Sequence, residues 1–112
     1  NLQRAQTPWL IVMMHSPWYS SSPAHRHEFQ TVNMRDSHGF EDLLFKHNVS
    51  LVLSGHVHAY ERTHPVYQNL TNKLGPTYLV VGAGGNREGL AGKYPKPAPA
   101  WSAFTDSSSF GH

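Results

Sequence analysis

Three of the nine histidines in this 112-residue chain follow short apolar runs, and their residue type suits metal binding. His15 comes directly after "LIVMM", whereas His56 and His58 come after "LVLSG" with one residue between them. Neutral imidazole is a common ligand of zinc, iron and related ions. Residues i and i+2 on an extended segment point to the same side, with Cα atoms about 6.5 Å apart. These three histidines are therefore candidate metal ligands.

Both this group and a second histidine pair also have a plainer explanation. Histidines at the end of a buried strand often serve only as hydrogen-bonded polar side chains. The second pair, His25 and His27, lies in "SSSPAHRHEF", on a segment that leaves the same strand edge as His15. These two residues are candidates for contact with an anion bound by the metal, or they are solvated loop residues. The residue types and spacing alone leave both alternatives open.

Three apolar runs predict the strands that position these histidines, at 9–14, 49–55 and 77–85. Each run is continuous and rich in Val, Ile, Leu or Tyr, which is typical of strands buried on both faces. The histidine candidates follow the first two runs, at the carboxyl ends of two neighbouring strands. In open α/β sheets this edge is where ligands bind.

A helix is predicted between the first two strands, because apolar residues recur at helical spacing in "GFEDLLF". We expect it to run from about Gly39 to Lys46, with Asp36 or Ser37 as its N-cap. A strand, a crossover helix and a second strand make an α/β unit. The sequence therefore predicts the α/β fold class.

The segments after the third run read as a turn, a loop and a further strand. "GAGGN" lacks the G-x-G-x-x-G spacing of a dinucleotide site and predicts a tight turn whose backbone passes close to the metal edge. "KYPKPAPAW" holds three prolines and predicts a surface loop. "WSAFTDSSSF" has residues compatible with a strand.

The composition excludes several classes of function. Nine Lys and Arg against seven Asp and Glu give a charge of only +2, without charged runs, which argues against nucleic-acid binding. The absence of cysteine excludes thiolate metal sites and cysteine nucleophiles within the chain. No apolar stretch approaches the roughly 20 residues that span a bilayer. The many histidines would make the chain more positive in an acidic compartment, which favours anionic substrates.

Two N-x-S/T triplets, at Asn48 and Asn69, raise the question of a secreted protein. Asn48 abuts an apolar run, whereas Asn69 lies in the polar stretch "YQNLTNKLG", which reads as an exposed loop. Asn69 is therefore the candidate for an N-linked glycan.

Four segments, in order and approximate spacing, resemble the C-terminal half of the metallophosphoesterase domain of purple acid phosphatases: "WLIVMMHSPWY", "VSLVLSGHVHAYER", "YLVVGAGGNREGL" and "WSAFTDSSSFGH". The resemblance spans nearly the whole chain, and "GHVHAYER" together with "HSPWY" is its specific part. It implies that residues 1–112 are a fragment, the C-terminal half of the catalytic domain, and supply one side of a four-layer α/β/β/α sandwich.

The resemblance also implies roles for the histidines. That family binds Fe(III) and a second divalent ion, which is Zn, Mn or Fe. By position, His15 and His56 resemble ligands of the divalent ion and His58 resembles a ligand of Fe(III). The family's other ligands belong to motifs of the D-x-G, G-D-x-x-Y and G-N-H-E kind, which do not occur in this chain. His27, followed by "EF", is the first choice for the catalytic loop histidine, and His25 is the second.

The implied activity is that of an acid phosphatase, which hydrolyses phosphate monoesters with a metal-bound hydroxide as nucleophile. The alternatives are a phosphodiesterase or nucleotide pyrophosphatase of the same superfamily, and a metal-binding or scaffold relative without catalysis. The resemblance further implies a secreted or extracellular location, or else a vacuolar or lysosomal one, and is compatible with a homodimer of the full-length protein.

Overall fold

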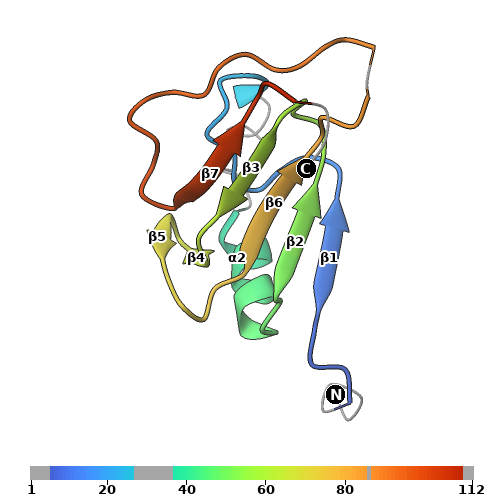
Figure 1. The fold of residues 1–112 in the computed structure, drawn as a ribbon. Helices are drawn as coiled ribbons and strands as arrows, with labels where there is room; N and C mark the ends of the chain where they lie inside the picture. Colours follow the sequence, from blue (N-terminus) through green and yellow to red (C-terminus); the bar gives the residue numbers. More distant parts are fainter. Residues whose placement is uncertain (1–5, 27–36, 86, 110–112) are drawn as a thin grey trace.

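The computed structural model describes residues 6–26, 37–85 and 87–109, and within them one five-stranded sheet organises the chain. The strand order is β1-β2-β6-β3-β7. These strands are β1 (Ile11–Met14), β2 (Leu51–Ser54), β3 (Tyr60–Thr63), β6 (Thr77–Val81) and β7 (Ser102–Asp106). β1, β2 and β6 are parallel, whereas β3 runs antiparallel to both β6 and β7. The carboxyl ends of all the strands except β3 therefore meet at one edge, where β3 begins (Figure 1).

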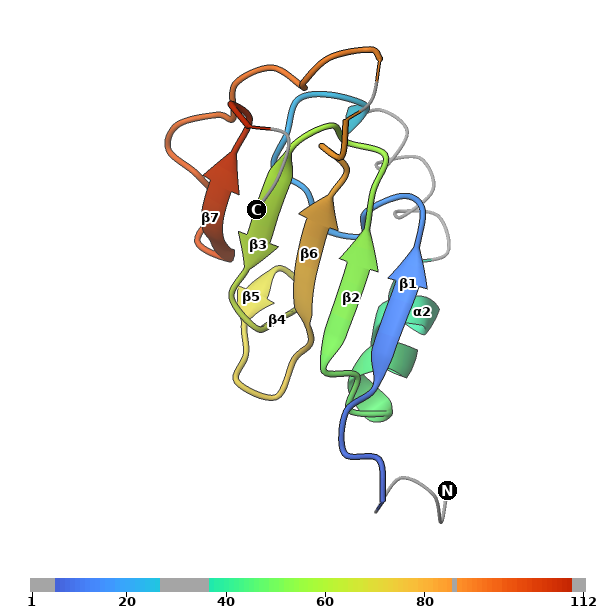
Figure 2. The ribbon, with the colours of Figure 1, turned by 45° about the vertical axis from the view of Figure 1, so that its right-hand side comes forward.

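One helix and one hairpin accompany the sheet in the described ranges. Helix α2 (Ser37–Lys46) lies against one face of the sheet in both views (Figures 1 and 2). The hairpin joins β4 (Val66–Tyr67) to β5 (Leu70–Thr71). Its two loop residues, 68 and 69, have φ angles of 50° and 62°, the left-handed pair that a type I′ turn requires. Nothing among the described helices is long and apolar enough to cross a membrane.

Most of the predicted elements are confirmed, with altered bounds. The three apolar runs contain β1, β2 and β6, and "WSAFTDSSSF" contains β7. The predicted helix forms but begins at Ser37 rather than Gly39, and the alternative N-cap Asp36 lies outside the described residues. The proline-rich segment carries neither helix nor strand. β3, β4 and β5 were not predicted, because "YERT" and the hairpin lack an apolar run.

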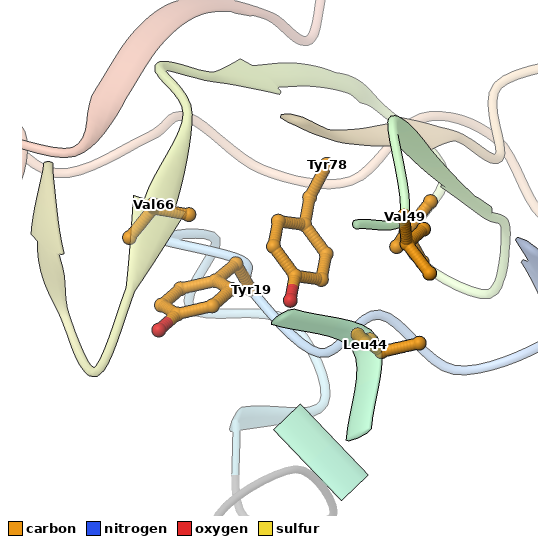
Figure 3. Packing of buried hydrophobic residues seen from close by; sticks show 6 residues of the cluster. Tyr19, Leu44, Val49, Val66 and Tyr78 are labelled. Carbon is orange, nitrogen blue, oxygen red and sulfur yellow. The ribbon is translucent and has the colours of Figure 1, made fainter. Parts of the chain in front are cut away.

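The apolar core lies between the sheet and α2. Its buried members are Tyr19, Leu44, Val49, Val52, Val66 and Tyr78. Figure 3 shows the rings of Tyr19 and Tyr78 beside each other, with centroids 4.8 Å apart and planes at 61°. Each fully buried aliphatic or aromatic side chain of this kind contributes about 1.5–3 kcal/mol. This cluster fixes the sheet against the segment that follows β1.

The opposite face of the sheet corrects one expectation. Burial on both faces was predicted for the apolar strands, but burial alternates along β1 and β2 in the described chain. Ile11, Met13, Val81 and Phe104 remain 54%, 79%, 48% and 49% exposed. The strand registers place all four on the same side. We call these four residues the open face, and it is open because α2 packs only on the other side.

Candidate metal centre

Two of the predicted ligands meet above the carboxyl edge of the sheet. His15 follows β1, and His56 lies in the loop that joins β2 to β3. The Gly55 N–H donates to the His15 carbonyl at 3.0 Å and ties the two loops together. His15 Nε2 then lies 2.9 Å from His56 Nδ1, with the rings nearly perpendicular at 73°.

A third imidazole joins this pair from the loop after β1. The ring centroids of His25 and His56 are 4.3 Å apart, with their planes tilted by 52°. His56 therefore contacts both His15 and His25. His27, the first choice from the sequence, lies outside the described residues.

His58 is held by the loop after β6. Its Nδ1 lies 3.1 Å from the Gly89 carbonyl oxygen, and its Nε2 lies 3.7 Å from a Glu88 carboxylate oxygen. The Ala91 N–H donates to the His58 carbonyl at 2.8 Å. Across residues 6–26, 37–85 and 87–109, no group of three or more His, Cys, Asp or Glu side chains is arranged to hold a metal ion.

The loop that carries His56 and His58 is bent rather than extended, so the spacing argument for this pair is wrong. Val57 N–H donates to the Gly55 carbonyl and Ala59 N–H donates to the Val57 carbonyl, at 2.7 and 2.8 Å. These contacts close two successive tight turns. The extended geometry that would put both imidazoles on one side is therefore absent from this loop.

Both histidines of the close ring pair have left-handed backbones. The φ angle is 62° at His56 and 58° at His25. A non-glycine residue with positive φ is uncommon and costs on the order of 1–3 kcal/mol, and such residues cluster at functional sites. Contacts with the surrounding residues must stabilise these two backbone conformations, in which the imidazoles of His25 and His56 lie side by side.

The turn after β6 supports the histidine loop from below. A Cβ atom built on Gly82 would lie 2.1 Å from the Val57 carbonyl oxygen, so only glycine fits there. Val57 itself is fully buried. The Gly85 N–H donates to the Ala83 carbonyl at 2.7 Å and closes the turn. The predicted tight turn is confirmed, and its backbone passes directly under the histidine loop.

The donor atoms fit first-row metal ions in part. Two nitrogens that each lie about 2.0–2.1 Å from one ion, about 90–110° apart, are separated by about 2.9–3.4 Å. The distance between His15 Nε2 and His56 Nδ1 is 2.9 Å. A hydrogen bond from His58 Nδ1 to the Gly89 carbonyl would leave Nε2 as its ligand atom, as outer-shell carbonyls do for metal-bound histidines. These residues supply imidazole donors, and carboxylates would have to come from elsewhere.

A buried carboxylate near these loops was missed from the sequence. Glu61 on β3 is 0% exposed. It accepts hydrogen bonds from the Ser21 N–H at 2.8 Å, from the Ser21 hydroxyl at 2.5 Å and from the Ser102 hydroxyl at 2.7 Å. A buried charge requires such partners. The available signal was the run of three serines at 20–22, which offers several donors in succession.

The buried tyrosines stay neutral. Burial raises the pKa of Tyr78 and Tyr94 well above the usual value, and nearby carboxylates add to the shift. Within the part of the chain that the structure describes, neither hydroxyl has a hydrogen-bond partner. Burial and a hydrogen bond to Glu41 likewise raise the pKa of Tyr19.

Two protein-family models match parts of the chain. A model described as "Calcineurin-like phosphoesterase" matches residues 1–60, and one described as "Iron/zinc purple acid phosphatase-like protein C" matches residues 75–112. The chain belongs to the calcineurin-like phosphoesterase family, and its last third matches the purple acid phosphatase model. The resemblance inferred from "GHVHAYER" and "HSPWY" is thus confirmed.

Individual relatives support the same family and fold. The chain is 50% identical over 111 residues to "Probable purple acid phosphatase 20" of Arabidopsis thaliana, covering 99% of this chain and 25% of that protein. It is 41% identical over 122 residues to "Phosphoenolpyruvate phosphatase" of Allium cepa, covering 99% and 24%. Purple acid phosphatase PPD1 from yellow lupin seeds has a TM-score of 0.78 and 34% identity, covering 93% and 20%. The chain spans about a quarter of the length of these curated relatives.

Proposed function

We propose that the protein containing this chain is an acid phosphatase that hydrolyses phosphate monoesters at a binuclear metal centre. The observation that carries the proposal is the contact of His15, His56 and His25 at the carboxyl edge of the sheet. Imidazoles that face one another at 2.9 Å suit a shared cation, and a third ring beside them suits the anion that such a cation attracts.

The metal assignment is the one that the resemblance to purple acid phosphatases implies. His15 and His56 would bind the divalent ion, which is Zn, Mn or Fe, and His58 would bind Fe(III). His58 is supported by its Gly89 contact, which orients the ring. Bound metal ions neutralise phosphoryl oxygens and lower the pKa of a bound water. The remaining ligands would come from parts of the protein outside this chain.

We take His25 as the loop histidine, and His27, which lies outside the described residues, stays the alternative. The His25 ring lies 4.3 Å from that of His56, so it is already next to the proposed ligand pair. When protonated, an imidazole carries an N–H on each ring nitrogen. It can then donate a proton to the departing alkoxide, a contribution of about 10²–10⁴-fold.

The open face would be covered by the rest of the catalytic domain. Met13 and Ile11 are 79% and 54% exposed, although apolar strand residues are normally buried. A second sheet packed on this side would complete the four-layer α/β/β/α sandwich. Such packing would also bring the missing carboxylate ligands to the same edge as His15 and His56.

A direct test uses the full-length protein with the variants His56→Ala, His25→Ala and His27→Ala. His56→Ala should lose metal together with activity. His25→Ala should keep its metal but lower kcat for an alkyl phosphate, and lower it less for nitrophenyl phosphate, whose leaving group needs little protonation. If only His27→Ala shows this dependence, the alternative assignment is correct. A protein that binds metal but hydrolyses no ester would be the scaffold relative instead.

An N-linked glycan at Asn69 would accompany a secreted or vacuolar protein. Asn69 and Thr71 are exposed on the β4–β5 hairpin. Asn48 is exposed as well, but its triplet continues into buried Val49 and into Ser50, whose hydroxyl accepts from the Leu10 N–H. Treatment of the secreted protein with an N-glycosidase should therefore convert Asn69, and not Asn48, to aspartate. A homodimer of the full-length protein stays a prediction that sedimentation would test.

A further inference from the structure

Glu61 stands at the junction between the central sheet and the loop that carries His25. It lies on β3, which pairs with β6 on one side and with β7 on the other. Its two carboxylate oxygens accept hydrogen bonds from Ser20, from both the N–H and the hydroxyl of Ser21, and from Ser102. Apart from the bond from Ser102, these contacts join the strand to the loop after β1.

The hydrogen bonds continue from Glu61 along the loop toward His25. The Ser22 N–H donates to the Ser20 hydroxyl at 3.2 Å, and the Ala24 N–H donates to the Ser22 hydroxyl at 3.2 Å. Ser22 is 1% exposed, so this path is buried at its centre. His25 follows directly, with its left-handed φ angle of 58°. The carboxylate therefore fixes consecutive residues up to the one that precedes the imidazole.

The same strand also adjoins the loop of His56, the other histidine of the ring contact. β3 begins at Tyr60, directly after the loop that contains His56. Glu61 thus ties the His25 loop to the strand from which the His56 loop departs. The two imidazoles would keep their 4.3 Å separation because both loops are anchored to one rigid element.

We propose that Glu61 is a positioning residue that holds His25 at the reaction centre. This inference rests on the proposed function, in which His25 protonates the leaving alkoxide. A displacement of about 1 Å by a remote substitution can cost about 100-fold in rate. Glu61 has no contact with substrate in this role, and acts only by holding the loop backbone.

The first experiment uses Glu61→Gln in the full-length holoenzyme. Gln keeps the volume but removes the charge and replaces one acceptor oxygen with a donor, so either the Ser21 N–H loses its acceptor or the Ser21 and Ser102 hydroxyls must accept instead of donate. We expect kcat for an alkyl phosphate to fall about 10–100-fold, and for nitrophenyl phosphate much less, with unchanged metal content. In a His25→Ala background the same substitution should have almost no further effect.

A matched pair of variants keeps the test decisive if Glu61→Gln fails to fold. Ser21 and Ser102 both donate a hydroxyl hydrogen bond to the same oxygen, Glu61 Oε1, at 2.5 and 2.7 Å. Both serines are half-buried. Ser21→Ala breaks a link to the His25 loop, whereas Ser102→Ala breaks only a link to β7. We expect similar losses of Tm but a leaving-group dependence of kcat only in Ser21→Ala.

The outcomes separate this inference from the proposed function. Equal losses for both substrates in Glu61→Gln, additive with His25→Ala, would overturn the positioning role and leave His25 as the acid. Identical kinetics for Ser21→Ala and Ser102→Ala would overturn it as well. If His25→Ala is itself silent, the assignment of the acid fails, and the role of Glu61 fails with it.

Discussion

The loops above the carboxyl edge and the core beneath α2 are held together in different ways. The core relies on apolar packing of side chains such as Leu44, Val52 and Tyr78. The loops rely on backbone contacts and on buried polar groups, including the close approach of Gly82 to Val57 and the serine donors to Glu61. Removing side-chain volume from a packed core lowers the free energy of unfolding. A small displacement of the loops instead changes the relative positions of the histidines. The two regions should therefore fail in different measurements.

The largest effect on stability is expected from Leu44→Ala in the full-length protein. Leu44 is 4% exposed in the core, and such truncations cost about 2–5 kcal/mol. Denaturant unfolding should show this loss, while kcat and metal content of the folded protein stay unchanged. Leu43→Ala on the same helix is the control, because Leu43 is 51% exposed and its loss should stay within about 0.5 kcal/mol. A comparable fall in kcat for Leu44→Ala would show that the core and the loops are not separable.

Gly82→Ala should do the reverse and damage the site more than the fold. The added Cβ would lie 2.1 Å from the Val57 carbonyl oxygen and displace the loop that carries His56. We expect kcat/KM to fall about 100-fold, with loss of bound metal, measured by steady-state kinetics and metal analysis. Gly84→Ala, two residues along the same turn, is the control, since a Cβ there meets nothing within 4 Å. Full activity in Gly82→Ala would show that the loop adapts without cost.

Two adjacent tyrosines in the core offer a finer comparison of polar and apolar contributions. The Tyr19 hydroxyl donates to Glu41 at 2.5 Å and accepts from the Asn69 N–H at 2.9 Å. Tyr19→Phe should therefore cost about 1–3 kcal/mol of unfolding free energy, because it leaves a buried carboxylate short of a donor.

The smallest effect is expected from Tyr78→Phe. The Tyr78 hydroxyl is buried without a hydrogen-bond partner among the described residues, so its removal relieves a desolvation cost. We expect the unfolding free energy to stay equal or to rise by up to about 1 kcal/mol. The same thermal or denaturant scan measures both tyrosine variants. A loss in Tyr78→Phe as large as in Tyr19→Phe would mean that this hydroxyl has a partner in the complete protein.

The sequence predicted the elements that rest on local patterns. Apolar runs marked β1, β2 and β6, and the rule that ligands gather at the carboxyl edge brought His15 and His56 together correctly. β3 was missed because "YERT" is mostly polar and contains no apolar run. Its place between β6 and β7 depends on pairing with segments that are distant in the sequence. The local pattern of such a strand carries too little information.

The details of the site depended on backbone geometry that the sequence does not display. The H-x-H argument assumed an extended segment, but the positive φ angle of His56 turns the chain there. The role of Glu61 depends on serines at 20 and 21, about forty positions away in the chain. The contact between His25 and His56 likewise came from ring positions and not from spacing.

The open face has a practical consequence for recombinant work on residues 1–112. Apolar side chains as exposed as Met13 and Ile11, on the edge strand β1, favour association between copies of the polypeptide in solution. Inclusion bodies or soluble aggregates are the expected product when these residues are expressed by themselves. Replacing Ile11 and Met13 with threonine or lysine would reduce this association and leave the core packing unchanged, since both side chains point away from α2. A soluble version of the chain would then be open to nuclear magnetic resonance, where the imidazole signals of His15, His25 and His56 could be followed one by one.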